Sequence, residues 1–243
     1  LALILSQIGF RVTLVEGGYK AFRAALVQDI VARVPGLSFK VICGPTGSGK
    51  TRLLQALAAQ GAQVLDLEAL ANHRSSVLGA MPGLAQPTQK RFETLIWDKL
   101  RGFDPALPVF VESESKKVGN LSVPTALMDA MRASPCLNLQ LSDAQRVALL
   151  LEDYAYLTQD VAYFCERLAK LTELKGHAVV ERWQTLAQQG DFSSVVMELL
   201  IQHYDPAYLQ SMQRNFVQFP QAVQLKPTDR SVAAMTKLAG QLS

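Results

Sequence analysis

The sequence predicts an α/β fold in which a parallel sheet carries helices on both faces, with a smaller piece before it and a helical section after it. Three observations support this prediction. Short apolar runs alternate with helical stretches between residues 37 and 141, a pattern typical of parallel sheets that are covered on both faces. A glycine-rich loop separates the first of these runs from a helical stretch. Beyond Leu141 the strand signals give way to consecutive amphipathic helices.

The first segment, residues 1–35, precedes the predicted sheet. It consists of a helix over Leu1–Gln7, a strand over Arg11–Val15, a glycine turn and a helix over Tyr19–Val34. Pro35 and Gly36 end this helix, because proline cannot continue a helix and glycine relaxes the backbone. The chain starts without methionine and inside an apolar helix, so we expect it to be a fragment of a longer protein.

The second segment, residues 36–141, alternates strands with helices. The predicted strands are Leu37–Cys43, Ala62–Leu67, Pro108–Val111 and Cys136–Leu141. The predicted helices are Thr51–Gln60, Thr88–Leu100 and Thr125–Met131. The apolar runs are too short for helices, which favours buried strands.

The third segment, residues 142–243, opens with a capping-box pattern at Ser142–Gln145. It continues to about Phe216 as amphipathic helices with little strand signal. We therefore expect a helical section that packs on or beside the sheet.

Composition and charge are those of a globular protein with a full core. Of the 243 residues, 49% are hydrophobic and 19% are charged, which argues against disorder. No apolar stretch reaches the ~18 residues that a membrane helix needs, so we expect no membrane partner. We also expect the protein to be a monomer and to be cytoplasmic. The formal net charge is only +3, which limits any contact with nucleic acid to a local patch.

Three cysteines, Cys43, Cys136 and Cys165, are widely spaced in apolar surroundings, and none belongs to a CxxC pair. Thiolate chemistry needs a polar and accessible environment. We therefore interpret all three as buried free thiols in a reducing cytoplasm.

The glycine-rich loop carries the clearest chemistry. It matches the Walker A pattern GxxxxGK[ST] at every fixed position, with a strand before it and a helix after it. Its residues are Gly44, Pro45, Thr46, Gly47, Ser48, Gly49, Lys50 and Thr51. Such glycines let backbone N–H groups turn toward an anion, and the following helix adds its positive end. The sequence thus predicts a P-loop NTPase-like domain, with Lys50 on the terminal phosphates and Thr51 on a phosphate-bound Mg²⁺ ion.

A Walker A loop needs a further carboxylate near the metal, and two predicted strands offer one. The strand Ala62–Leu67 contains Asp66 and runs into Glu68, and another strand runs into Glu112 and Glu114. Strand ends at this edge of an α/β sheet face the ligand crevice. The candidate catalytic or metal-binding residues are therefore Asp66, Glu112 and Glu114. Solvated loop carboxylates and helix caps stay open as the alternative.

Basic residues follow the same strands and begin the helix between them. They are His73, Arg74, Lys90, Arg91, Lys116 and Lys117. If they converge on the face of the loop, they form a surface that binds RNA phosphates. Scattered surface charge is the alternative.

Four ordered motifs give this sequence a resemblance to a known family, the bacterial tRNA 2-selenouridine synthases. The motifs are Gly44–Thr51, Leu65–Arg74, Gln86–Glu93 and Val111–Gly119, whereas a generic kinase would share only the first. The resemblance implies the replacement of sulfur by selenium at the wobble 2-thiouridine of tRNA through an S-geranylated intermediate. It implies geranyl diphosphate and selenophosphate as co-substrates. A diphosphate suits a Walker A loop as well as ATP or GTP does, so the ligand of the loop stays open.

The same resemblance implies a rhodanese-like domain before the Walker A domain. Residues 1–35 resemble the C-terminal remnant of such a domain through the predicted strand and the run Glu16–Phe22. The selenium-carrying cysteine of the family lies before the helix that begins this chain, and none of the three cysteines occupies its position. We therefore expect the chain by itself to be incompetent for selenation. The alternative function is an ATP-dependent small-molecule kinase or a nucleotide-binding module that ignores tRNA.

Overall fold

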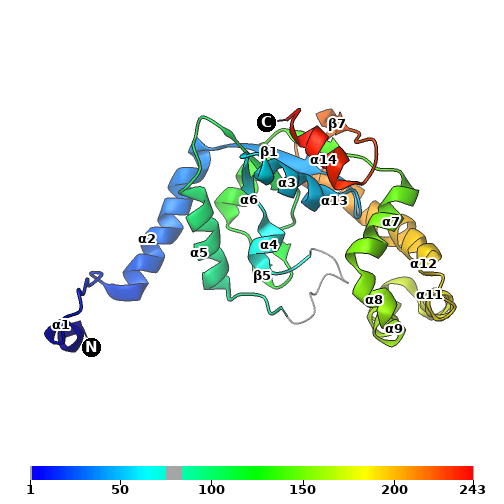
Figure 1. Cartoon of the computed structure of the whole chain (residues 1–243), viewed down its shortest axis with the longest axis horizontal. Coiled ribbons are helices and arrows are strands. Elements are labelled where there is room, and N and C mark those ends of the chain that lie inside the picture. Colours follow the sequence, from blue (N-terminus) through cyan, green and yellow to red (C-terminus); the bar gives the residue numbers. More distant parts are fainter. Residues whose placement is uncertain (1, 75–83, 243) are drawn as a thin grey trace.

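A five-stranded, wholly parallel sheet forms the centre of the computed structural model, which describes residues 2–74 and 84–242 (Figure 1). Its strands are β1 (Ser38–Cys43), β2 (Gln63–Leu65), β3 (Pro108–Glu112), β6 (Cys136–Leu139) and β7 (Val223–Leu225). Their order is β2-β3-β1-β6-β7, and every neighbouring pair is parallel. Because β1 has β3 on one side and β6 on the other, the loop after β1 lies where the strand order reverses, the usual ligand crevice of such sheets.

Apolar side chains of β1 and β3 explain why both faces of the sheet are covered. Phe39 and Val41 belong to the core on one face, whereas Ile42 belongs to the core on the other. In β3, Val109 and Phe110 divide in the same way. Since successive side chains of a strand point to opposite faces, an unbroken apolar run indicates a strand that is buried on both sides.

Helices pack on each face of this sheet. One core joins the sheet to α2 (Gly18–Arg33), α4 (Leu67–Ala71), α5 (Gln89–Leu100) and α6 (Thr125–Ala133). The opposite core joins it to α3 (Lys50–Ala59) and α14 (Val232–Ala239). The predicted α/β class, a P-loop NTPase-like parallel sheet with helices on both faces, is therefore confirmed. A short antiparallel hairpin, β4 (Lys117–Val118) and β5 (Leu121–Ser122), follows β3.

The predicted helical section has a core of its own. Its elements are α7 (Asp143–Asp153), α8 (Ala155–Gln159), α9 (Val161–Ala169), α10 (Thr172–Lys175), α11 (His177–Gln188), α12 (Phe192–Leu199), a π-helical turn (Leu200–Tyr204) and α13 (Asp205–Asn215). Trp183 is fully buried at its centre, and its indole N–H donates to Glu198 Oε2 at 2.8 Å. Helices α8, α9, α11 and α12 lie at the end of the molecule opposite α1 and α2 (Figure 1), whereas Met212 of α13 belongs to the core of the sheet.

Strand β7 lies beyond Phe216, after the stretch in which the sequence predicts consecutive helices. It pairs with β6, after a 3-10 turn at Phe219–Gln221, and α14 then packs on α3. A three-residue edge strand carries too little periodicity to be found in a sequence. The division into residues 1–35, 36–141 and 142–243 stays a prediction. From within the third part, β7 adds the edge strand of the sheet and α14 covers one of its faces.

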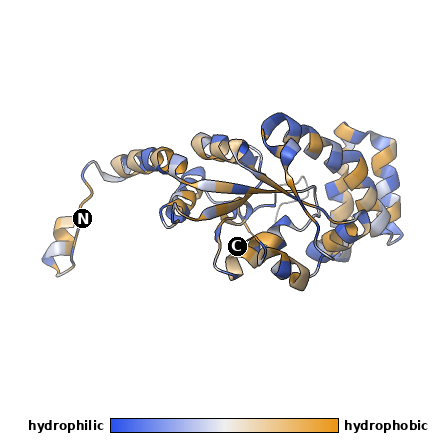
Figure 2. Cartoon of the chain, turned by 90° about the horizontal axis from the view of Figure 1, so that it is seen from above, coloured by the Kyte–Doolittle hydropathy of each residue, from blue (hydrophilic) through white to orange (hydrophobic). Residues whose placement is uncertain are grey.

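The strand predicted over Arg11–Val15 is wrong. These residues have no regular secondary structure, although the flanking helices α1 (Ala2–Gln7) and α2 form as predicted. A strand needs a neighbour to satisfy its N–H and C=O groups, and none of the described strands lies beside this segment. Figure 2 shows the N-terminal helix α1 set apart from the body of the molecule. Its Leu3 and Ile4 are exposed. Within the described ranges, no helix has the length and apolar character needed to cross a membrane.

Candidate functional site

The loop between β1 and α3 has the backbone conformation of an anion-binding nest. Gly47 and Gly49 have φ values of 78° and 89°, a region that glycine adopts readily and other residues rarely do. A Cβ atom at Gly47 would lie 3.0 Å from the backbone oxygen of Arg146, so packing disfavours a side chain there as well. Because α3 begins at Lys50, its unpaired N–H groups and its positive end face the loop.

Lys50 lies inside the loop that precedes it. Its ammonium donates to the carbonyl oxygen of Gly44 at 2.7 Å and to that of Pro45 at 3.4 Å. Tyr208 of α13 closes the other side: its hydroxyl accepts the N–H of Gly44 at 2.6 Å, and its ring centroid lies 5.9 Å from Lys50 Nζ. Burial raises the pKa of Tyr208, so its hydroxyl stays protonated at neutral pH.

Three carboxylates gather beside Thr51. Glu68, Glu112 and Glu114 each offer an oxygen, and these oxygens lie within 4.8 Å of one another. Glu112 is buried, and its Oε1 accepts from Thr51 Oγ1 at 3.4 Å. Burial raises the pKa of Glu112 well above its ordinary value, and the charges of Glu68 and Glu114 raise it further. A cluster of carboxylate oxygens next to a hydroxyl matches the ligands that Mg²⁺ prefers.

Asp66 has a different place from the other two predicted carboxylates. Its Oδ1 accepts the N–H of Ala69 at 2.8 Å, so it caps the N-terminus of α4. This cap also ends β2 at Leu65, before the predicted end at Leu67. The structure therefore brings Glu112 and Glu114 together with Glu68, which the sequence marked only as the residue after a strand.

A cavity of about 500 Å³ opens beside the loop and the carboxylates. Lys50 and Glu112 line one side, and residues of the helical section, among them Leu150 and Tyr204, line the other. Of the six basic candidates, Arg74 lines this cavity. Its guanidinium donates to the carbonyl oxygen of Asp153 at 3.0 Å, which fixes it against the end of α7.

Lys90, Arg91, Lys116 and Lys117 are exposed on two neighbouring segments. The side chain of Gln86, just before α5, accepts the N–H of Asn120 at 2.8 Å, so the start of α5 lies against the β4–β5 hairpin. These four cations are therefore grouped in two adjacent pairs, one at the start of α5 and one at the hairpin.

His73 contributes less charge than its neighbours. Burial lowers the pKa of His73, so its imidazole is neutral at pH 7. A surface that joins all six basic candidates on one face stays a prediction.

Arg146 of α7, like Tyr208, contacts the loop and is not among the residues that the sequence marked. Its buried guanidinium donates from Nε to the carbonyl oxygen of Thr46 at 3.0 Å, and from Nη1 to Asp205 and to Asp143 at 2.9 Å each. It therefore ties the phosphate loop to α7 and α13. No local signal could identify it, because Thr46 and Asp205 are 100 and 59 residues away in the chain.

Of the three cysteines, Cys43 ends β1 and directly precedes the loop. Cys43 and Cys136 are buried free thiols, as predicted, whereas Cys165, which was also predicted to be buried, is half-buried. Burial raises the pKa of Cys165, which keeps its thiol protonated. In the part of the chain that the structure describes, no cysteine lines the cavity.

Comparison with known proteins gives a consistent result. A family model described as the AAA domain of tRNA 2-selenouridine synthase matches residues 37–170. The chain is 33% identical over 233 residues to the tRNA 2-selenouridine synthase of Alcanivorax borkumensis, covering 84% of this chain and 63% of that protein. It is 34% identical over 224 residues to the enzyme of the same name from Cupriavidus necator, covering 80% and 59%. The chain thus spans less than two thirds of either relative. No solved structure matches it.

Proposed function

Because the chain belongs to the tRNA 2-selenouridine synthase family by its AAA domain, we propose that it acts on tRNA in the conversion of wobble 2-thiouridine to 2-selenouridine. The observation that carries the proposal is the phosphate loop, with the Lys50 ammonium inside it and the buried Glu112 beside Thr51. The names of the relatives supply the tRNA substrate. The loop supplies the place for a phosphorylated co-substrate.

We assign geranyl diphosphate to this loop. In the transfer step, the sulfur of 2-thiouridine forms a bond to C1 of the geranyl group while the C1–O bond to diphosphate breaks, and the N3–H of the base loses its proton to water. The diphosphate leaves with the electron pair of that bond, so negative charge grows where the loop N–H groups and Lys50 are fixed. Lys50 needs only to exchange its carbonyl acceptor on Gly44 for a phosphate oxygen.

The residues around Thr51 fit a Mg²⁺ ion. Thr51 Oγ1, Glu112 and the neighbouring Glu68 and Glu114 offer only oxygen atoms, in a cluster with excess negative charge. When bound, Mg²⁺ would neutralise charge on the leaving diphosphate. Glu112 and Glu114 are buried and Glu68 is partly buried.

Selenophosphate is the proposed donor of selenium in the second half of the reaction. Since no cysteine lines the cavity in the described part of the chain, we propose that residues 1–243 by themselves carry out geranyl transfer and do not introduce selenium. We further propose that the chain works as a monomer in the cytoplasm, where its tRNA substrate is found.

The test is mass spectrometry of the nucleosides of thiolated tRNA after incubation with the chain, Mg²⁺ and geranyl diphosphate. We expect S-geranyl-2-thiouridine with the unaltered chain and none with Lys50→Ala. Adding selenophosphate should give no selenouridine, and its formation would overturn the proposed division of steps. The kinase alternative predicts turnover of ATP without tRNA, and that result together with an absence of geranylated product would overturn the proposed function.

A further inference from the structure

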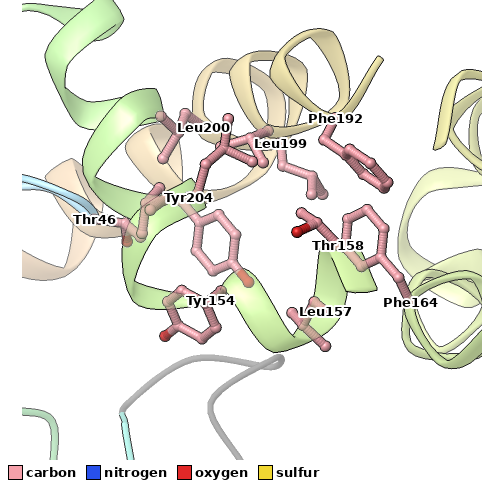
Figure 3. A pocket seen from close by; sticks show the side chains of 12 residues that line it. Thr46, Tyr154, Leu157, Thr158, Phe164, Phe192, Leu199, Leu200 and Tyr204 are labelled. Carbon is pink, nitrogen blue, oxygen red and sulfur yellow. The ribbon is translucent and has the colours of Figure 1, made fainter. Parts of the chain in front are cut away.

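A second pocket, narrow and apolar, lies beside the phosphate loop (Figure 3). Helices of the helical section form its walls through Leu150, Leu157, Thr158 and Leu199. Figure 3 shows Thr46 of the loop at one side of the pocket and the rings of Phe164 and Phe192 at the other. The centroids of these two rings are 5.9 Å apart, so together they form an aromatic wall opposite the loop.

The apolar pocket is continuous with the larger polar cavity. Thr46, Leu150, Tyr154 and Tyr204 line both. A ligand whose phosphates occupy the loop can therefore extend an attached group into the apolar pocket. Such a ligand needs a charged head and an apolar tail, because charged side chains such as Lys50 and Glu112 line the cavity whereas mainly apolar side chains line the pocket.

The size of the pocket restricts that tail. Its volume is about 50 Å³, and one water-sized group needs roughly 10–15 Å³ on the same measure. The pocket therefore holds on the order of four such groups, which is close to the five carbons of one isoprene unit. A nucleobase is larger than this and carries polar edges that these aliphatic and aromatic walls would leave unpaired.

We propose that this pocket receives the outer isoprene unit of a two-unit allylic diphosphate, and that Phe164 and Phe192 limit the length of the chain. The inference rests on the proposed function, since it takes the head of that diphosphate to be bound in the loop. The inner isoprene unit then lies at the junction that Thr46 and Tyr204 form. Each CH₂ group buried in the pocket contributes about fourfold in affinity, so one occupied isoprene unit discriminates strongly between chain lengths.

Two variants of the whole chain test the pocket, one that fills it and one that enlarges it. Thr158→Phe places a ring among the walls, and Gln159→Phe, at an exposed position of the same helix, is its matched control. Phe192→Ala removes part of the aromatic wall. Phe192 is half-buried whereas Phe164 is buried, so the fold tolerates the loss of the Phe192 ring better. Calorimetry with Mg²⁺ measures the affinity of inorganic diphosphate and of dimethylallyl, geranyl and farnesyl diphosphate.

We expect Thr158→Phe to lower the affinity for geranyl diphosphate at least about tenfold and to leave the affinity for inorganic diphosphate unchanged. Gln159→Phe should bind both ligands as the original chain does. Phe192→Ala should raise the affinity for farnesyl relative to geranyl diphosphate about tenfold. Unchanged preferences in both variants, with inorganic diphosphate still bound, would overturn the role of the pocket and leave the phosphate assignment standing. A chain that binds neither inorganic nor geranyl diphosphate would instead overturn the proposed function.

Discussion

Replacing Arg146 by alanine is expected to destabilise the fold and weaken phosphate binding together. The guanidinium is buried and joins Thr46, Asp205 and Asp143. Loss of one partner of a buried ion pair costs about 3–5 kcal/mol. The side chain of Asp205 is 33% exposed, so water replaces part of the lost interaction, whereas Asp143 is 55% exposed and adds little. We therefore expect a loss of about 3 kcal/mol in the free energy of unfolding.

Urea unfolding measures this loss, and Arg101→Ala is the control. Arg101 pairs with Asp98 at the surface, where both side chains are more than half exposed, and its removal should cost less than about 1 kcal/mol. Calorimetry with inorganic diphosphate measures the second effect, since Arg146 holds the carbonyl of Thr46. If Arg146→Ala unfolds like Arg101→Ala and binds diphosphate like the original chain, Arg146 does not support the loop.

Three further predictions follow from the site. Lys50→Ala should abolish calorimetric binding of both inorganic and geranyl diphosphate without changing the unfolding curve, because it removes the mobile charge on the phosphates; retained binding would refute the loop assignment. The pKa of Glu112 is raised in the folded state. Between the ordinary carboxyl pKa and this raised pKa, the folded state therefore binds more protons than the unfolded state. The free energy of unfolding falls as pH rises through that window. Glu112→Gln should flatten this dependence in thermal unfolding, and Mg²⁺ should stabilise the original chain more at pH 8 than at pH 6; equal pH profiles would contradict the site. Removing Lys116 or Lys117 should lower the slope of log K for tRNA binding against log salt concentration by about one. Removing Lys99, at the far end of α5, is the control and should leave this slope unchanged. Equal slopes for all three variants would argue against the basic surface.

The phosphate loop could be predicted because everything it needs is local. The strand, the glycines, Lys50 and Thr51 follow one another in the chain, and Gly47 and Gly49 have the positive φ values that glycine adopts readily. The two faces of the sheet could be predicted for the same reason, since an unbroken apolar run in β1 indicates burial on both sides.

The parts that the sequence did not reveal depend on distant contacts. The strand expected at Arg11–Val15 has suitable residues, but strand formation also requires a neighbour. Asp66 and Glu68 are both carboxylates near the end of β2, and the start of α4 decides that the first caps the helix while the second turns toward Glu112. For Tyr208, which lies 164 residues beyond Gly44, no spacing rule exists.

The helical section therefore has a role that its amphipathic pattern alone could not indicate. Arg146 and Tyr208 each contact the backbone of the loop, and Leu150 and Tyr204 line both the polar cavity and the apolar pocket. In the proposed assignment, the edge of the sheet binds the diphosphate of any such ligand, and the helical section contacts the group attached to it. If the proposed assignment is right, substitutions at the sheet edge will change the affinity for all diphosphates alike, and substitutions in the helical section will change the preference among them.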